Sequence, residues 1–306
     1  MKKLLEAMEE KLYGQKRNVR LLAAAMLAGG HVLLEGVPGL GKTRMARTLA
    51  GLTGGDYRRI QFTPDLMPGD ITGSVIFNLR DNAFTTVRGP VFANILLADE
   101  INRSGPKTQA ALLEAMEERQ VTIQGTTYGL PDPFFVIATQ NPVEYEGTYP
   151  LPEAQLDRFL FKLVLDYPGE EAEKQILRGH VPFHEEREEP VQQVLSLEEI
   201  RALRKELSGV IVEDSLIGYI TAIIRRTRES KRVQLGASPR AGIAVMMAAK
   251  AWALMEGRTY VTPDDIKLVA LPALRHRLLL NPQTELEGGT SDHIIQETLA
   301  AVPVPR

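Results

Sequence analysis

The first half of the chain alternates short, mostly apolar segments with helical patterns. Segments of strand length lie at residues 31–34, 57–62, 95–98, 134–139 and 158–165. Helical patterns lie between or before them, at residues 2–12, 15–28, 44–52 and 107–118. Apolar strands interleaved with helices indicate a parallel sheet that is covered on both faces. We therefore predict an α/β domain whose ligands bind at the carboxyl ends of the strands.

Two segments that resemble β-hairpins interrupt this alternation of strands and helices. In residues 74–92, two β-like stretches flank a turn, which predicts an inserted hairpin. The alternative is that both stretches are further strands of the main sheet. Residues 121–128 flank Gly125 in the same way and predict a second hairpin. Residues 63–70 contain two prolines and a glycine and are predicted to form a loop.

The second half of the chain lacks the alternation of strands and helices that marks the first half. Residues 181–190 are rich in proline and glutamate, and only helices are predicted after residue 196, at residues 196–207, 213–229, 238–256 and 262–280. We therefore predict a small helical bundle as a second domain. The expected domains are an α/β domain at 1–167, a linker at 168–190 and a helical domain at 191–306.

Composition narrows the possible classes of function. A length of 306 residues, 44% hydrophobic and 25% charged, fits about two globular domains. The net charge of −3 gives no overall electrostatic attraction for nucleic acid. Without cysteine there is no disulfide, thiol nucleophile or cysteine-ligated metal. The start lacks a signal peptide, and the apolar stretch 21–34 is too short to span a bilayer, so we expect a soluble cytoplasmic protein.

A glycine-rich pattern directly follows the first apolar strand and precedes a helix. It reads Gly36-Val37-Pro38-Gly39-Leu40-Gly41-Lys42-Thr43. In this context the glycines let backbone N–H groups surround a phosphate, and the helix N-terminus adds partial positive charge. We predict that all eight residues bind ATP, with Lys42 reaching the β- and γ-phosphates. An ordinary glycine-rich turn is the alternative.

Two acidic residues end another apolar strand. Asp99 and Glu100 follow residues 95–98, and the tip of this strand is expected beside the glycine-rich loop. Asp99 and the hydroxyl of Thr43 are candidate Mg²⁺ ligands, since Mg²⁺ prefers oxygen donors. Glu100 can polarise a water for attack on the γ-phosphate. Adjacent acids are also common helix caps, so this prediction depends on the glycine-rich loop.

Asn141 and three arginines complete the candidate site. Asn141 follows the next apolar strand, where it could bind the γ-phosphate or orient the water; an Asn-Pro turn is the alternative. Arg158 is a candidate arginine finger for the phosphate of a neighbouring subunit, and Arg103 could also face a neighbour. Arg240 begins a helix of the second domain and could fold over the phosphates. Each arginine could instead be a solvated surface charge.

Together these motifs resemble the AAA+ ATPases and, within them, the MoxR family, over nearly the whole chain. The stretches that carry the resemblance are Gly36-Val-Pro-Gly-Leu-Gly-Lys-Thr43, Gln61-Phe-Thr-Pro-Asp-Leu66, Asp70-Ile-Thr-Gly73, Arg88-Gly-Pro-Val-Phe92, Ala98-Asp-Glu-Ile-Asn-Arg103, Ala138-Thr-Gln-Asn-Pro142 and Glu153-Ala-Gln-Leu-Asp-Arg-Phe159. The first is shared by many ATPases. The second and the last are much more specific.

The resemblance implies an AAA+ domain followed by an all-α lid, with Asn141 as sensor 1, Arg158 as arginine finger and Arg240 as sensor 2. It also implies that residues 74–92 are an insert in helix 2 and residues 121–133 a hairpin before sensor 1. Family members form rings, usually hexamers, with ATP bound between subunits. They are thought to mature partner proteins or insert cofactors, often with a partner that carries a von Willebrand A domain. The implied activity is a Mg²⁺-dependent ATPase acting on a client protein.

Three other classes of function fit the sequence less well than a remodelling ATPase. A P-loop kinase would need an acceptor pocket and would not need Glu100 beside Asp99. A DNA-associated motor is disfavoured because Gln120, Gln124 and the threonines of the second hairpin give it little positive charge. A structural ring subunit without hydrolysis is disfavoured by the intact pair of acids.

Overall fold

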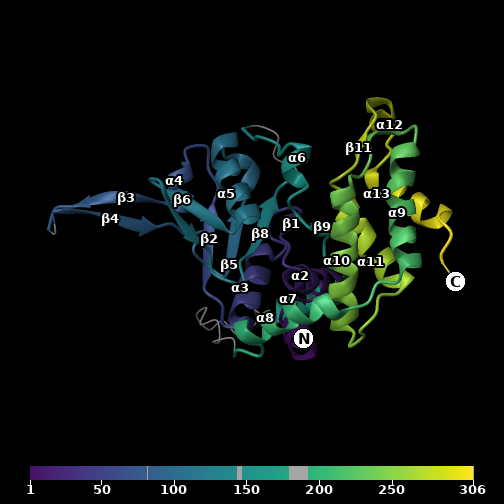
Figure 1. The fold of residues 1–306 in the computed structure, drawn as a ribbon, viewed down its shortest axis with the longest axis horizontal. Helices are drawn as coiled ribbons and strands as arrows, with labels where there is room; N and C mark the ends of the chain where they lie inside the picture. The colour runs from purple at the N-terminus through teal and green to yellow at the C-terminus, as the bar shows by residue number, and fades with distance from the viewer. Residues whose placement is uncertain (81, 143–146, 179–191, 306) are drawn as a thin grey trace. The chain divides into compact units, whose positions relative to one another are not determined.

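The computed structural model describes residues 1–80, 82–142, 147–178 and 192–305, which form two compact units (Figure 1). The first unit comprises Met1–Arg20, Leu33–Leu151 and Val164–Arg201. The second unit comprises Leu21–Val32, Pro152–Leu163 and Ala202–Arg306. The chain therefore passes between the units several times, and the domain boundaries near residues 167 and 190 stay predictions.

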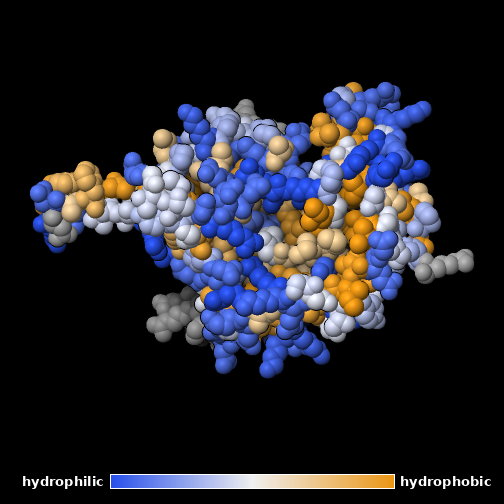
Figure 2. All heavy atoms as spheres, in the orientation of Figure 1, coloured by the Kyte–Doolittle hydropathy of each residue, from blue (hydrophilic) through white to orange (hydrophobic). Residues whose placement is uncertain are grey.

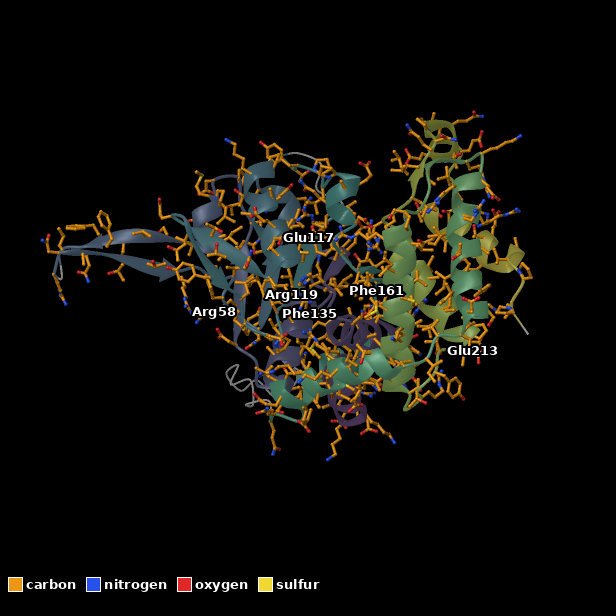
Figure 3. All side chains as sticks on the ribbon, in the orientation of Figure 1. Arg58, Glu117, Arg119, Phe135, Phe161 and Glu213 are labelled. Atoms are coloured by element: carbon orange, nitrogen blue, oxygen red, sulfur yellow. The ribbon has the colours of Figure 1, made fainter. Side chains whose placement is uncertain are left out.

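A five-stranded sheet with the order β2-β5-β8-β1-β9 is built from the first half of the chain. Its strands are β1 (Val32–Glu35), β2 (Tyr57–Gln61), β5 (Ile95–Asp99), β8 (Phe135–Gln140) and β9 (Phe161–Val164). β5 runs parallel to β2 and to β8, as predicted. Every residue of β1, β5 and β8 is buried except the last, which is partly exposed. A strand covered on both faces needs apolar side chains throughout, and here polarity begins at the carboxyl end. Phe135, fully buried at the start of β8, is labelled in Figure 3.

Helices in or entering the first unit are α1 (Lys2–Lys11), α2 (Lys16–Leu27), α3 (Lys42–Thr53), α4 (Pro68–Thr72), α5 (Pro106–Glu118), α7 (Glu170–Arg178) and α8 (Leu197–Glu206), with a 3₁₀ turn η1 (Ile101–Arg103). Two of them were not predicted. Helix α4 begins inside the predicted loop 63–70. The N–H of Met67, the residue before the helix, donates to Oδ2 of Asp70 at 2.8 Å, which stabilises the start of the helix. Helix α7 lies within the predicted linker; three glutamates in its first turn suit the helix dipole. The rest of that linker, from residue 179 to 190, lies outside the described residues.

Both predicted hairpins are present and separate from the main sheet. One consists of β3 (Gly73–Asn78) and β4 (Ala83–Arg88), the other of β6 (Gln120–Ile123) and β7 (Thr126–Gly129), each pair antiparallel. The alternative that residues 74–92 extend the main sheet is therefore wrong. Figure 2 shows hydrophobic side chains gathered on the β3–β4 hairpin, where Leu79 is 86% and Phe84 is 76% exposed.

The second unit is mainly helical. Its elements are α6 (Glu153–Leu156), η2 (Leu207–Gly209), α9 (Asp214–Glu229), β10 (Val233–Leu235), α10 (Pro239–Met255), α11 (Pro263–Leu274), β11 (Leu279–Leu280), α12 (Pro282–Leu286) and α13 (Ser291–Ala301). Helix α10 buries a row of small residues, including Ala244, Ala248 and Ala251, which lets α11 approach closely. Ser238 caps α10 by accepting a hydrogen bond from the N–H of Ala241.

The prediction of helices alone after residue 196 is wrong in one respect. β10 pairs with β11 as a short antiparallel ribbon, with Val233 opposite Leu280. Helix α11 ends at Leu274 instead of continuing to residue 280, and Pro272 in its last turn has no N–H to donate. The pattern of apolar residues up to residue 280 fits a longer helix as well as a helix followed by a buried two-residue strand, so the sequence could not separate the two.

Within the described ranges, no helix combines the length and the apolar character needed to cross a membrane.

Candidate functional site

Three neighbouring strands bring the predicted groups of the first unit to one edge of the sheet. In the order β5-β8-β1, the acidic pair ends β5, Asn141 follows β8 and the glycine-rich loop follows β1. The N–H of Gly36 donates to the carbonyl of Gln140 at 3.4 Å, which joins the start of the loop to the end of β8. The carboxyl ends of parallel strands meet at one edge, so the predicted position of the site follows from the topology.

The glycine-rich loop curves tightly back on itself. A Cβ at Gly36 would lie 2.9 Å from the carbonyl oxygen of Leu165, so a larger residue would collide with backbone. Gly39 and Gly41 have φ of +86° and +78°, in the left-handed region that glycine adopts without strain. Lys42 begins α3, and its Nζ donates to the carbonyl of Gly36 at 2.7 Å. The ammonium group therefore lies across the loop that the sequence assigns to phosphate.

Thr139 joins the two acidic residues. Its hydroxyl donates to Oδ1 of Asp99 at 2.6 Å and accepts the backbone N–H of Glu100 at 2.8 Å. Arg59 holds the other carboxylate oxygen of Asp99 through Nε at 3.1 Å and Nη2 at 2.7 Å. The Asp99 side chain is only 13% exposed, so both of its oxygens have a fixed orientation.

Glu100 has an unusual backbone conformation. Its φ of 56° and ψ of 50° lie in the left-handed region, which non-glycine residues enter only when the surroundings enforce it. Its Oε2 accepts hydrogen bonds from Gln61 Nε2 at 2.7 Å and from Arg103 Nη1 at 3.0 Å. Strain of this kind is concentrated at functional sites, which agrees with the role predicted for Glu100.

Three contacts of the acidic pair were not assigned from the sequence: those of Arg59, Gln61 and Thr139. The register of the sheet explains Gln61, because it lies opposite Asp99 at the end of the neighbouring strand. Gln61 and Thr139 both lie in stretches that carried the family resemblance, but their partners come from strands distant in sequence. Only the pairing of the strands could identify those partners.

The remaining predicted residues fall in two places. Asn141 is 5% exposed at the end of β8, and Arg103 contacts Glu100 of its own chain, both in the first unit. Arg158 and Arg240 belong to the second unit. There, Arg240 Nε lies 3.9 Å from Oδ2 of Asp157, the residue that precedes Arg158. The structure thus brings the two arginines into one compact unit, although the sequence assigned them to different domains.

The donor set at the sheet edge fits Mg²⁺. Asp99 offers a carboxylate and Thr43, in the first turn of α3, a hydroxyl, and both are hard oxygen ligands. No group of three or more His, Asp or Glu side chains in the described part of the chain could hold a metal by itself. Mg²⁺ commonly takes only one or two protein ligands and completes its shell with phosphate oxygens and water.

Comparison with known proteins places this geometry in a family. Residues 31–161 match the model of the ATPase family associated with various cellular activities (AAA), and residues 225–298 match the AAA lid domain. Over 306 aligned residues the chain is 42% identical to the chaperone MoxR1 of Mycobacterium tuberculosis, covering 96% of this chain and 80% of that protein. The chain belongs to the MoxR family of AAA+ ATPases.

Two further relatives match nearly the whole length of this MoxR-family chain. The uncharacterised protein YeaC of Bacillus subtilis is 53% identical over 291 residues, covering 95% of this chain and 90% of that protein. A crystal structure from Cytophaga hutchinsonii, of a protein provisionally assigned as an ATPase, has a TM-score of 0.92 and 43% identity. It covers all of this chain and 94% of that one. The predicted fold, an AAA+ domain with a helical lid, is confirmed.

Proposed function

We propose that this MoxR-family ATPase hydrolyses ATP with Mg²⁺ at the interfaces of a ring, which is expected to be a hexamer. In this proposal the energy released remodels or matures a client protein in the cytoplasm, for example by inserting a cofactor. A partner with a von Willebrand A domain is expected to present the client. The name of the Mycobacterium tuberculosis relative, a chaperone, supports action on other proteins.

The observation that carries the proposal is the arrangement of Glu100. Its carboxylate lies at the sheet edge beside Asp99, in a strained backbone conformation that Thr139 helps to fix. A carboxylate fixed next to a phosphate-binding loop can accept the proton of a water that attacks the γ-phosphate. Phosphate binding alone would not require this second acid.

The other residues of the first unit have supporting roles in the proposed reaction. Lys42 and the N–H groups of residues 36–43 balance the charge on the β- and γ-phosphates. Asn141, buried at the end of β8, binds the γ-phosphate or orients the attacking water. Asp99 and Thr43 would hold Mg²⁺, which when bound neutralises part of the phosphate charge. Arg158 and Arg240 contribute cations from the second unit, Arg158 toward the nucleotide of a neighbouring subunit.

The central experiment separates binding of ATP from its hydrolysis. We expect Glu100→Gln to keep the affinity for a fluorescent ATP analogue within a few-fold while phosphate release falls by about 10²-fold or more, because a general base is worth roughly that much. Glu118→Gln, the same change on an exposed residue at the end of α5, is the control and should retain full turnover. Full turnover by Glu100→Gln would refute the proposal.

The same assay distinguishes the proposal from a small-molecule kinase. The wild-type protein is expected to release phosphate from ATP with no acceptor added, and Lys42→Ala should abolish binding of the nucleotide. A kinase would show turnover only after an acceptor is supplied. Mass spectrometry of proteins retained by the Glu100→Gln variant with ATP would then identify the client.

A further inference from the structure

The guanidinium group of Arg59 lies against Asp99, the carboxylate that is expected to hold Mg²⁺. Arg59 belongs to β2, the strand beside β5 at the edge of the sheet. Its Nε and Nη2 donate to Oδ2 of Asp99 at 3.1 and 2.7 Å, and Nη2 also donates to Oε1 of Gln61 at 2.6 Å. The Arg59 side chain is 46% exposed, and an arginine without such partners would extend its charge into water. The three hydrogen bonds therefore fix a positive charge next to Asp99.

The two oxygens of Asp99 are used differently by their partners. A carboxylate oxygen can accept about two hydrogen bonds. Oδ2 accepts both of its hydrogen bonds from Arg59, so it has no further capacity to accept. Oδ1 accepts one from the hydroxyl of Thr139 at 2.6 Å and keeps a lone pair. This lone pair of Oδ1 is the one available to a divalent ion or to a water bound to the ion.

A donor beside a metal ligand has two opposing effects on the affinity for the metal. It fixes the orientation of the ligand, which favours binding, and a donor that is a cation also repels the metal, which disfavours binding. Without Arg59, the hydroxyl of Thr139 would still hold Oδ1 of Asp99, so much of the orientation would remain. The repulsion of a divalent ion by Arg59 would be lost completely. For Arg59 the repulsion is therefore the larger effect.

We propose that Arg59 lowers the affinity of the nucleotide site for its divalent ion. The protein then holds the ion mainly through the phosphate oxygens of the nucleotide, and Asp99 contributes only a weak attraction. Arg59 thereby keeps the ion from remaining on the protein after the nucleotide has left. This inference rests on the proposed function, in which Asp99 holds Mg²⁺.

The test measures the affinity of the protein for a fluorescent, non-hydrolysable ATP analogue, once in excess Mg²⁺ and once in EDTA. The ratio of the two affinities reports how much more tightly the bound analogue holds the ion than the free analogue does. Any direct effect of a substitution on the nucleotide cancels in this ratio. In Arg59→Gln the ratio should rise about two- to tenfold, because a single charge repels a divalent ion twice as strongly as it attracts an exposed carboxylate at the same distance. An unchanged or lower ratio would overturn the proposal.

Two further variants separate the charge of Arg59 from other causes. Arg59→Lys keeps the charge but loses the fork that contacts both Asp99 and Gln61, so the ratio should stay near that of the wild type. A rise as large as that of Arg59→Gln would show that geometry is responsible, and the proposal would be wrong. Arg58→Gln is the matched control, because Arg58, labelled in Figure 3, is the neighbouring residue of β2 and pairs with Asp56 at 3.5 Å. It removes the same charge and should leave the ratio unchanged; a rise equal to that of Arg59→Gln would also overturn the proposal.

Asp99→Asn distinguishes a failure of this proposal from a failure of the proposed function. Changing a residue that only supports a metal ligand commonly costs about tenfold or more in affinity, so loss of the ligand itself should lower the ratio at least that much. A ratio that Asp99→Asn leaves unchanged would contradict the metal site of the proposed function, and the role of Arg59 with it. A ratio that Asp99→Asn lowers and Arg59→Gln leaves unchanged would overturn the role of Arg59 alone.

Discussion

The carboxylates of the first unit and the arginine segment of the second unit are held in different ways. Asp99 and Glu100 are partly exposed and are fixed through their side chains, by hydroxyl, amide and guanidinium groups at neighbouring strand ends. The segment around Arg158 is fixed mainly through backbone carbonyls, by the buried His276 and Arg277. Side-chain contacts determine where one charge lies, whereas carbonyl contacts fix a whole segment. We therefore expect substitution of the residues that hold Asp99 and Glu100 to alter turnover, and substitution of the residues that hold the segment around Arg158 to alter stability.

The largest effect is expected when one residue of each region is substituted, each in a different subunit. Arg158→Ala and Glu100→Gln subunits should each be nearly inactive alone, since one lacks the finger and the other the base. Mixed in equal amounts, they should recover about a quarter of wild-type turnover, because random assembly combines the intact groups at one interface in four. Phosphate release measured at several mixing ratios tests this. If no ratio restores activity, the two regions do not form a shared site.

A smaller effect is expected when one hydroxyl is removed from the first unit. Thr139→Val keeps the shape of the side chain but leaves the N–H of Glu100 without its partner and Oδ1 of Asp99 without a donor. Losing hydrogen bonds to a charged group costs about 1.5–3 kcal/mol, so turnover should fall roughly 10- to 100-fold. Thr139→Ser retains the hydroxyl and should keep most of the activity in a steady-state ATPase assay. Equal ATPase rates for Thr139→Val and Thr139→Ser would show that the hydroxyl does not position Asp99 and Glu100.

The smallest effect concerns the dependence of stability on pH in the second unit. Burial lowers the pKa of His276 well below its ordinary value, and the charge of Arg277 lowers it further. Nε2 of His276 lies 2.9 Å from the carbonyl of Phe159, so this nitrogen must donate. Nδ1 has no hydrogen-bond partner among the described atoms. Protonation in the folded state would therefore place a buried charge at an unpartnered nitrogen.

The sign of the effect follows from proton binding. Below pH 6.5 the unfolded chain takes up a proton at this histidine and the folded chain does not, so stability is lost as the pH falls. The contribution is at most about 1.4 kcal/mol per pH unit. Urea unfolding between pH 7.5 and 5.5 should show this slope in the wild type and a shallower one in His276→Gln. An equal slope in the wild type and in His276→Gln would contradict the assignment.

Much of the first unit could be predicted from the sequence. Continuous apolar segments predicted the buried strands, because a strand covered on both faces requires apolar residues at adjacent positions. The glycines before Lys42 predicted the tight loop after β1, and the binding of phosphate by this loop stays a prediction. The acids after residues 95–98 were predicted at the end of such a strand. The roles assigned to residues 36–43, Asp99, Glu100, Asn141, Arg158 and Arg240 all stay predictions, and so does their contact with nucleotide.

The tertiary structure decided which distant residues act on those groups. Nothing near Thr139 in the sequence indicates that its hydroxyl joins Asp99 to Glu100, since that contact depends on β8 lying beside β5. Likewise, no local pattern indicates that Arg277 fixes the segment around Arg158. Their separation exceeds 100 residues, and the contact arises only when α11 ends at Leu274 and the chain turns. A local pattern records the conformation of a segment, whereas a partner from another segment is determined by packing of the whole chain.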